Sequence, residues 1–516
     1  MPDTTAILVA AIVGVLLLGL SLLLRVGSRA QDLPPGPETT PILGNSMQFP
    51  RTFPYLRFSQ WAEEYGEIIS LKIFNSDIVV LSSPEAIKGV LDKQGIHTGN
   101  RAHSIILERG IGAMFAFSDM DTDLWRKGRK AIHPLVTPTS IDRHLPIHQI
   151  EGLQLLGDIL DNPKDTYYHI RRATASILTS LVYGHRSLGY RGTRIEKFYQ
   201  MVELMNITSD PNAHPPVDLI PILRYVPARW APWKTICDRL HAIRRELYGT
   251  LLSEVEQGMA TGTAPDCLIA DLLRDRDSLD MTMDEIDTTG ATIMDAGSET
   301  SSSYLQNFVL MLANHPNFQR HAQREIDRVI GTDRLPNIED FDKLPYVQAL
   351  IQELHRFRPL LPMALPHVAT QDVIYKAYRI PKGSTIFMNI WGIYHNPDLF
   401  DDPGTFNPER YLASRFGVKA DVDTSSFKDD YVFGAGRRAC PGKDMANRTI
   451  ALYTMYLLWA FDFSKDGSDC SDLSLDQYAK PGFELAPLLF TLSIKPRDVH
   501  RESLIRRSLQ LEGLAS

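Results

Sequence analysis

Helical periodicity limits the fold of this chain more than any other feature of its sequence. Apolar residues recur at intervals of three and four over residues 52–65, 86–94, 148–160, 194–205, 233–257 and 283–313. Patterns typical of β-strands are short and scattered, at residues 68–73, 78–82, 373–375, 384–389 and 488–494. The sequence therefore predicts a mainly α fold with a minor β-sheet.

Prolines crowd one later part of the chain and exclude long helices from it. They stand at Pro359, Pro362, Pro366, Pro381, Pro397, Pro403 and Pro408, and each one fixes φ and removes a backbone donor. We expect loops and short strands there, and such loops usually carry function. No flexible linker divides the 516 residues, so residues 51–498 are predicted to form one domain, followed by a C-terminal tail at residues 499–516.

An uncharged apolar run occupies residues 6–24, which is long enough as a helix to cross most of a hydrocarbon layer. It lacks the basic start and the small-residue cleavage site of a signal peptide, so residues 1–29 are predicted to be an uncleaved, single-pass anchor. Arg25 and Arg29 follow the run, which places the body in the cytosol, at the endoplasmic reticulum in a eukaryote. The proline-rich residues 30–50 are expected to form a stiff hinge and the start of the body.

The charge and the cysteines exclude several classes of protein. A formal net charge of −8 argues against a nucleic-acid partner, which usually leaves a basic face. The four cysteines, Cys237, Cys267, Cys440 and Cys470, have neither the spacing of a zinc site nor that of a disulfide framework. A lone thiol on the reducing side of a membrane is free to act as a ligand, so the surroundings of each cysteine decide its role.

The loop around Cys440 is the most informative stretch of the chain. Gly434 and Gly436 let the loop turn tightly and approach a flat group, and Gly442 lets a helix pack beside it. Arg438 stands two residues before the cysteine and offers a guanidinium to a carboxylate. A helix is predicted from residue 446 onward, and its N-terminal end favours a thiolate nearby.

Five residues of this loop, Phe433, Gly436, Arg438, Cys440 and Gly442, occupy the fixed positions of the pattern Phe-x-x-Gly-x-Arg-x-Cys-x-Gly. In this feature the chain resembles the cytochrome P-450 family, whose haem-binding signature has this form. The resemblance implies the cytochrome P-450 fold, here preceded by one transmembrane helix, and haem b as the cofactor. It implies that Cys440 is the thiolate ligand of the iron and that Arg438 pairs with a haem propionate.

A Glu-x-x-Arg pair lies in a predicted helix upstream of the cysteine loop. The spacing of Glu353 and Arg356 puts both side chains on one face of that helix. An isolated pair of this kind is weak support for any function, but here Arg410 follows in the segment Phe-Asn-Pro-Glu-Arg. The order resembles the family's structural network of one glutamate and two arginines, which implies a structural role for all three residues.

The stretch Ala296-Gly297-Ser298-Glu299-Thr300-Ser301 interrupts a long amphipathic helical pattern. Glycine and adjacent polar side chains weaken a helix interior, because they raise its entropy cost and compete for backbone hydrogen bonds. Taken alone, the stretch is a solvated polar face. It resembles the oxygen-binding helix of the family, which implies that Ala296 and Gly297 open a groove for dioxygen. Glu299 and Thr300 would then be the catalytic residues that relay protons.

Two further features resemble the family's contacts to the haem propionates. Trp125 and Arg129 lie one helical turn apart, and both side chains can donate hydrogen bonds. His367 follows Leu365-Pro366 at a position where the family often places another donor. Alone, the pair would be a surface cation beside an aromatic ring, and the histidine a satisfied loop residue.

The predicted function is that of a monooxygenase that inserts one atom of O2 into a lipophilic small molecule. No nucleotide-binding or flavin-binding region follows a predicted strand, so electrons are expected from an NADPH-dependent cytochrome P-450 reductase on the same membrane. Two alternatives stay open: oxidative coupling, ring closure or desaturation by the same thiolate iron, and a haem-binding protein without catalytic activity.

The substrate does not follow from the sequence. By resemblance, the pocket is lined from residues 99–119, 292–296, 360–365 and 483–487, which are mixed apolar and fit a lipophilic ligand of moderate size. The stretch from Pro366 through Arg410 most resembles fungal members that act in secondary metabolism. Ala377 departs from the glycine that many of those relatives have at its position.

Overall fold

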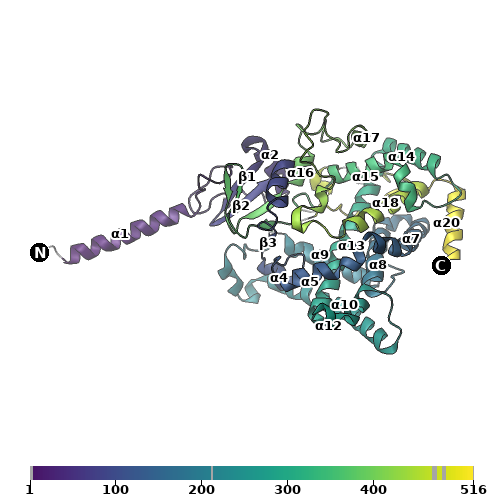
Figure 1. Ribbon diagram of the computed structural model, residues 1–516, viewed down its shortest axis with the longest axis horizontal. Coiled ribbons are helices and arrows are strands. Elements are labelled where there is room, and N and C mark those ends of the chain that lie inside the picture. Colours follow the sequence, from purple (N-terminus) through teal and green to yellow (C-terminus); the bar gives the residue numbers. More distant parts are fainter. Residues whose placement is uncertain (1–3, 211–212, 468–472, 479–483, 515–516) are drawn as a thin grey trace. The chain divides into compact units, whose positions relative to one another are not determined.

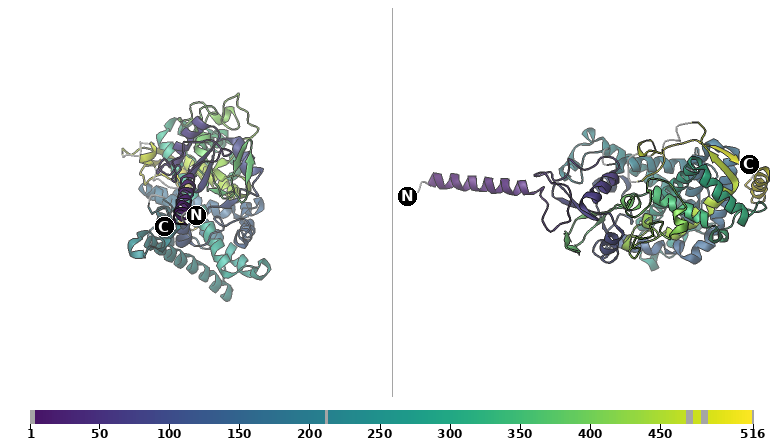
Figure 2. Two further views of the ribbon diagram at one scale, coloured as in Figure 1. Left: turned by 90° about the vertical axis from the view of Figure 1, so that its left-hand side faces the viewer. Right: turned by 90° about the horizontal axis from the view of Figure 1, so that it is seen from above.

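The computed structural model describes residues 4–210, 213–467, 473–478 and 484–514 (Figure 1). Contacts divide the chain into two compact units, each made of several segments of sequence. The first unit holds Met1–Ala102, Met363–Ile393 and Ser425–Ala439, and the second holds His103–Pro362, Tyr394–Thr424 and Cys440–Ser516. Helices predominate in every view (Figure 2), so the predicted mainly α fold with small sheets is confirmed.

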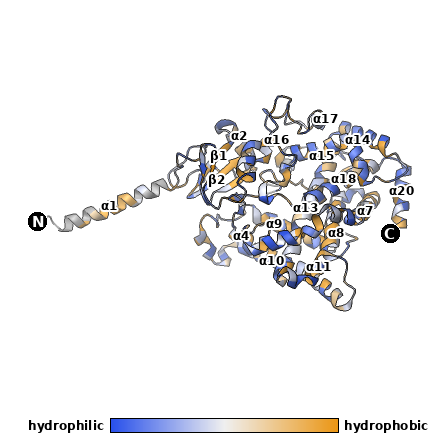
Figure 3. Ribbon diagram, viewed as in Figure 1, coloured by the Kyte–Doolittle hydropathy of each residue, from blue (hydrophilic) through white to orange (hydrophobic). Residues whose placement is uncertain are grey.

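The first unit is built on a mixed five-stranded sheet with the order β1-β2-β7-β4-β3. Its strands are β1 (Ile68–Ile73), β2 (Ser76–Leu81), β3 (Asn100–Arg101), β4 (His367–Val368) and β7 (Thr385–Met388). Only β2 and β7 run parallel, and the other neighbours are antiparallel. Both long strands β1 and β2 carry hydrophobic residues (Figure 3), because the sheet packs on α2 (Pro54–Tyr65) around buried Phe58 and Trp61.

Three other helical segments and a hairpin complete the first unit. The helices are α3 (Pro84–Ile87), which continues into a π-helical turn at Lys88–Asp92, and α16 (Ile390–Tyr394). Strands β5 (Val373–Tyr375) and β6 (Tyr378–Ile380) form the hairpin. Its turn places Lys376 in the left-handed region at φ 52°, so the tight turn forms although Ala377 stands where relatives have glycine.

The predicted hinge is part of the first unit and is tied to its sheet. Arg29 donates hydrogen bonds to the carbonyl oxygens of Gly36 at 2.8 Å, Pro37 at 2.7 Å and Ser70 of β1 at 3.0 Å. The hydroxyl of Ser70 donates in turn to the carbonyl of Pro34 at 2.5 Å. The proline-rich stretch therefore has a fixed path along β1.

The apolar run at the start of the chain forms α1 (Thr4–Arg25). Several of its large apolar side chains are exposed, including Leu8, Val15 and Leu16. Within the described residues, however, no helix is long and apolar enough to cross a membrane. The predicted transmembrane helix is therefore not confirmed.

The second unit is almost entirely helical. Its helices are α4 (Ile105–Ile111), α5 (Asp123–Ala131), α6 (His133–Val136), α7 (Pro138–Asp161), α8 (Thr166–Tyr183), α9 (Arg194–Ser209), α10 (Pro232–Thr261), α11 (Leu268–Arg274), α12 (Arg276–Leu279), α13 (Met283–Asn314), α14 (Pro316–Val329), α15 (Pro345–Phe357), α17 (Arg410–Ala413), α18 (Lys443–Ala460), α19 (Leu475–Tyr478) and α20 (Val499–Leu511). A small antiparallel sheet pairs β8 (Phe461–Ser464) with β9 (Ser493–Pro496).

The 32-residue helix α13 is central to this unit and packs against α8, α10 and α18 (Figure 1). A capping box between Thr282 and Glu285 starts it, and Pro316 begins the next helix just after it ends. The helix predicted at residues 283–313 is confirmed, and it continues through Gly297 without a break. A Cβ at this position would lie 2.5 Å from Leu178 of α8, so the glycine serves the close approach of two helices.

Several predicted boundaries were wrong. Helix α7 begins ten residues earlier than the pattern suggested, because Thr137 caps it and Pro138 occupies its first turn. The strand expected at residues 488–494 begins only at Ser493. The segment expected to be a C-terminal tail forms α20, which packs against α7, where Leu509 lies beside Gly157.

Candidate functional site

Within the first unit, the loop before Cys440 is anchored on the π-helical turn at Lys88–Asp92. The carboxylate of Asp92 accepts hydrogen bonds from the backbone N–H of Gly436 at 2.8 Å and from Lys428 at 2.5 Å. Gly436 has a φ of 58°, and a Cβ on it would lie 2.1 Å from the carbonyl oxygen of Leu91. Only glycine fits there, which gives a physical reason for this position of the signature. Phe433 ends a 3₁₀ turn just before it.

Three basic side chains gather in the first unit. Arg438 is buried and its Nε donates to the carbonyl of Gly99 at 2.5 Å. Arg101 is also buried and donates to the carbonyls of Leu365 and Pro366 at 2.7 and 3.0 Å. Burial and the charge of Arg438 lower the pKa of Arg101 to about 9. The cluster therefore concentrates positive charge where an anionic group would be stabilised.

His367 completes this basic cluster and carries a defined tautomer. Its Nδ1 donates to the carbonyl oxygen of Thr98 at 2.8 Å, so the neutral ring has its second nitrogen free of a proton. Burial, followed by the charges of Arg101 and Arg438, lowers the pKa of His367 to about 3. The predicted role as a donor to a carboxylate therefore requires that the anion raise this pKa, so that the second ring nitrogen takes up a proton from solvent.

Within the second unit, Cys440 lies just before α18, whose N-cap is Gly442. The thiol is exposed to solvent, yet desolvation by the surrounding protein is the main influence on the pKa of Cys440 and raises it. The backbone N–H of Gly442 and the guanidinium of Arg129 lower this pKa. An accessible thiol at a helix N-terminus beside a cation suits a thiolate ligand.

Gly442 directly precedes α18 and is its N-cap. A Cβ on this residue would meet only the sulfur of Cys440, at 3.9 Å, among the described residues. Its contribution comes from the backbone, as the hydrogen-bond donor and as the residue from which α18 starts. That helix begins at Lys443, three residues earlier than predicted.

Trp125 and Arg129 lie one turn apart on α5, as expected. Thr122 caps the helix by accepting from the backbone N–H of Trp125, and Lys127 pairs with Glu285 of α13 at 3.3 Å. Desolvation lowers the pKa of Arg129, whereas the Cys440 thiolate raises it. Arg129 and Cys440 are therefore close enough to shift each other's pKa, whereas Glu299 is not among the groups that shift either one.

The network of Glu353, Arg356 and Arg410 is confirmed. The two Glu353 oxygens accept from Nε and Nη2 of Arg356 at 2.8 Å each, and Arg410 pairs with Glu353 at 3.2 Å. Glu353 also accepts from the backbone N–H of Asn407 at 2.7 Å, and neither Glu353 nor Arg356 is exposed. Both arginines also bind backbone carbonyls of the segment from Tyr394 to Thr405.

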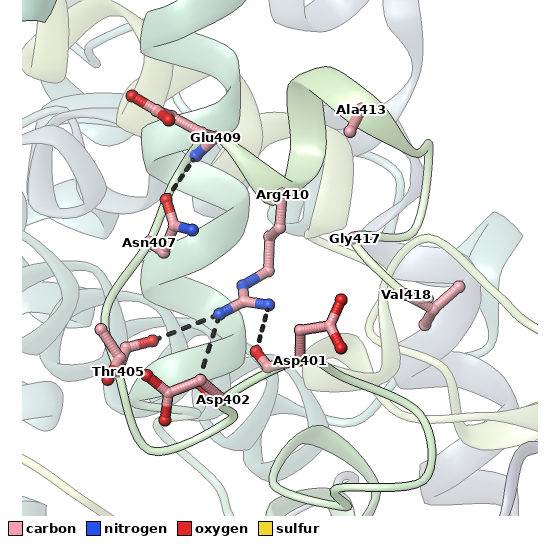
Figure 4. A pocket seen from close by; sticks show the side chains of 9 residues that line it. All are labelled: Asp401, Asp402, Thr405, Asn407, Glu409, Arg410, Ala413, Gly417 and Val418. Atoms are coloured by element: carbon pink, nitrogen blue, oxygen red, sulfur yellow. Dashed lines mark hydrogen bonds between the residues drawn. The ribbon is translucent and has the colours of Figure 1, made fainter. Parts of the chain in front are cut away.

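Arg410 also lines a polar cavity of about 340 Å³ that belongs to this segment. Figure 4 shows its guanidinium pointing at the backbone of Asp401, Asp402 and Thr405. The cavity therefore reflects the folding of a proline-rich loop around an arginine. The helix that carries Glu353 is fixed at its other end by Glu325 of α14, whose carboxylate accepts from the backbone N–H groups of Tyr346 and Val347 at 3.0 to 3.1 Å.

Glu299 and Thr300 are neighbours in sequence but have different surroundings on α13. Glu299 is buried against α8, where its carboxylate pairs with Arg171 at 3.6 Å. Desolvation raises the pKa of Glu299, and the charge of Arg171 lowers it. The hydroxyls of Ser302 and Ser303 lie close enough to this carboxylate to favour its charged form, although neither meets the geometry of a good hydrogen bond within the described residues.

Thr300 is partly exposed, about 100° around the helix from Glu299. Its hydroxyl donates to the carbonyl oxygen of Ala296, one turn earlier, at 2.8 Å. This is an ordinary conformation for a threonine in a helix. The hydroxyl must therefore turn away from its own backbone before it can donate to a ligand, while its oxygen can accept at any time.

Several residues of interest escaped the sequence analysis. Arg101 lies in a two-residue strand without any motif, and Arg171 of α8 is far in sequence from its partner Glu299. Glu484 carries a carboxyl group that interacts with both Glu299 and Arg171. Phe483, the first residue of one predicted pocket segment, and Cys470 lie outside the described residues.

The residues in each unit fit the haem that the resemblance implies. The first unit offers Arg101, Arg438 and His367, a donor set suited to the two carboxylates of haem b. The second offers an accessible Cys440 thiol with Arg129 and Trp125 nearby on α5. In the described part of the chain, no cluster of His, Cys, Asp and Glu competes as a metal site.

Comparisons with known proteins agree with these features. The family model described as Cytochrome P450 matches residues 34–490. Cytochrome P450 monooxygenase ple5B of Rhodocybe pseudopiperita is 38% identical over 94% of both chains, and cytochrome P450 monooxygenase patI of Aspergillus clavatus is 32% identical over 100% of this chain and 99% of its own. A zebra fish cytochrome P450 structure with abiraterone covers 86% of this chain and 100% of its own, at 26% identity and a TM-score of 0.69.

Proposed function

Because this chain belongs to the cytochrome P450 family, whose members bind haem b through a cysteine thiolate, we propose that it is a monooxygenase with Cys440 as the iron ligand. The substrate is a lipophilic small molecule, one atom of O2 enters it, and electrons come from a redox partner. The accessible thiol of Cys440 within the complete signature, next to Arg129, is the observation that carries the assignment. Haem b supplies, when bound, the iron at which O2 is activated.

The basic side chains hold and orient the cofactor in this proposal. Arg101 and Arg438 neutralise carboxylates. Burial, followed by the charge of Arg438, lowers the pKa of Arg101 to about 9, and a bound anion opposes both effects. His367 becomes a further donor once the charge of such an anion raises the pKa of its ring and the second ring nitrogen takes up a proton from solvent. Trp125 and Arg129 donate to the same kind of group from α5.

Glu299 and Thr300 move protons to the reacting oxygen. Desolvation raises the pKa of Glu299 and the charge of Arg171, 3.6 Å away, opposes this rise, so Glu299 accepts a proton and releases it toward the reacting oxygen. The Thr300 hydroxyl rotates away from the carbonyl of Ala296, donates its proton, and receives another. Positioned donors of this kind are typically worth about 10² to 10⁴ in rate.

The electron donor, the membrane and the pathway are further parts of the proposal. We assign an NADPH-dependent reductase as the donor and α1 as a single-pass anchor in the endoplasmic reticulum, with the body in the cytosol. The uncharged run at residues 6–24 supports the anchor, and release of the protein from membranes by salt alone would contradict it. The stretch from Pro366 through Arg410 supports a place in secondary metabolism. Product mass with labelled O2 separates oxygen insertion from coupling or desaturation.

The test of the assignment is a change at Cys440. Cys440→Ser should abolish both turnover and the thiolate-type absorption of the reduced carbonyl complex, because a hydroxyl is a poor donor to iron. Cys237→Ser is the matched control, since this thiol is buried on α10 with Ile106 as its partner, and it should keep the normal spectrum. A Cys440→Ser protein with the wild-type spectrum would overturn the assignment.

A further inference from the structure

A buried polar stripe runs along α13 from Glu299 toward the end of the helix. Ser302, Ser303, Gln306 and Asn307 follow Glu299 at intervals of three, four, seven and eight residues, so all five share one face. Each of these side chains is at most 4% exposed. Burying polar groups costs free energy unless they are paired, so the stripe requires an explanation.

Each residue of this polar stripe has one polar atom without a hydrogen-bond partner in the described chain. These atoms are Glu299 Oε2, Ser302 Oγ, Ser303 Oγ, Gln306 Oε1 and Asn307 Oδ1. The two amide nitrogens are satisfied, because Gln306 donates to Tyr167 and Asn307 donates to Leu485. Buried polar atoms rarely stay unpaired, and several on one face indicate that ordered water binds along it.

A second carboxyl group, that of Glu484, interacts electrostatically with Glu299 at the start of the stripe. Glu484 directly precedes Leu485, whose carbonyl accepts from Asn307 of the stripe, and its Oε2 is buried without a hydrogen-bond partner among the described residues. Desolvation and the charge of Glu299 raise the pKa of Glu484, whereas the charge of Arg171 lowers it. Two carboxyl groups therefore share one arginine, and this favours a single charge on the pair.

Aromatic side chains around the Glu299–Glu484 pair hold Arg171 in place. The rings of Tyr167 and Tyr199 lie 4.8 and 4.3 Å from its guanidinium carbon, and Tyr190 also interacts with it. Glu203 of α9 adds a negative charge that disfavours ionised Glu299. The salt bridge between Arg171 and Glu299 favours the negative charge of the pair on Glu299 rather than on Glu484.

We propose that Glu484 supplies the protons that Glu299 delivers, through water held by the hydroxyls of Ser302 and Ser303. The O–H bond of protonated Glu484 breaks, one proton moves along the water to the carboxylate of Glu299, and a new O–H bond forms there. Glu484 is left as a carboxylate and regains a proton from solvent water, and no electrons move. Glu484 acts through Glu299 and does not touch the reacting atoms. The inference rests on the proposed function of Glu299.

Infrared spectroscopy of the holoenzyme with ¹³C-labelled glutamate tests the protonation directly, because the label separates glutamate from aspartate and haem carboxyl groups. A protonated glutamate band should be present at neutral pH and absent in Glu484→Gln. In Glu299→Gln the neighbouring charge is lost while Arg171 remains, so this band should titrate at a lower pH. Absence of the band in the wild-type enzyme, or its persistence in Glu484→Gln, would overturn the proposal.

Kinetics provide the second readout. Glu484→Gln should lower the rate of product formation about 10-fold. This loss is smaller than for a direct proton donor, because water replaces part of the proton supply. The solvent isotope effect on the rate should also change. Glu484→Asp should restore part of the rate, and Glu256→Gln, on the exposed face of α10, should stay within about twofold. Wild-type rate and isotope effect in Glu484→Gln would end the proposal.

Failure of the proposed function and failure of the role of Glu484 give different results. If the wild-type protein lacks the thiolate-type absorption, the proposed function fails, whatever Glu484 does. If the wild-type protein has that absorption and forms product while Glu484→Gln behaves identically, only the role of Glu484 fails. A normal thiolate spectrum in Glu484→Gln shows that the variant is folded and loaded.

Discussion

Neutralising Glu353 should be one of the most destabilising single changes in the second unit. The carboxylate is fully buried, accepts two hydrogen bonds from Arg356 at 2.8 Å and one from Asn407 at 2.7 Å, and pairs with Arg410. Glu353→Gln keeps the shape but leaves two buried guanidinium groups without their counter-charge. Breaking a buried pair in this way costs about 3–5 kcal/mol, or roughly a 100- to 4000-fold rise in the unfolded fraction.

The matched control is a pair with the same spacing on another helix. Asp271 and Arg274 of α11 are also three residues apart and bonded at 2.7 Å, but their side chains are 44% and 62% exposed. Asp271→Asn should cost only about a few tenths of a kcal/mol, because water screens the charges. Urea unfolding followed by tryptophan fluorescence, with haem content measured in parallel, compares the two variants. Similar midpoints for both would refute the argument that burial sets the cost.

Three other predictions follow from the site and its supports. Thr300→Ala should keep haem, substrate binding and NADPH use, while product per NADPH falls about 10-fold or more and hydrogen peroxide rises. Thr300→Ser retains a hydroxyl and should form as much product per NADPH as the wild type. A wild-type ratio in Thr300→Ala would remove Thr300 from the mechanism. Gly436→Ala forces a side chain into the left-handed region against Leu91, so its unfolding midpoint and haem content should drop, whereas Gly442→Ala should unfold like the wild type. Burial lowers the pKa of His148 to about 4, so the unfolded chain binds a proton at a higher pH than the folded chain. The free energy of unfolding should therefore fall as the pH drops from about 6.5 toward 4. His148→Gln should flatten this pH dependence in urea titrations.

Local patterns in the sequence predicted much of the candidate site. The spacing of Glu353 and Arg356, the glycines of the cysteine loop and the helix of Glu299 depend on residues close to each other in the chain, so they are visible without a structure. The close approach of α8 at Gly297 could not be predicted in this way, because Leu178, which a Cβ on Gly297 would meet, is far away in the sequence.

The residues that sequence analysis missed act through long-range contacts. Arg171 and Glu484 become relevant only when α8 and the Glu484–Leu485 segment pack against α13. No periodicity in the sequence predicts these contacts. Arg101 sits in a two-residue strand, too short for any alternation. The early start of α7 could have been found, because Thr137 and Pro138 are ordinary signals of a helix start.

Arg29 has a practical consequence for anyone who wishes to shorten this protein. It follows the apolar helix in sequence, yet it clamps the carbonyls of Gly36, Pro37 and Ser70. Removal of residues 1–25 deletes the apolar segment and keeps the hydrogen bonds of Arg29. Removal of residues 1–29 also deletes Arg29 and with it the hydrogen bond to Ser70 of β1. Two shortened proteins that differ by only these four residues should therefore differ in their resistance to proteolysis near Ser70, with the longer one surviving.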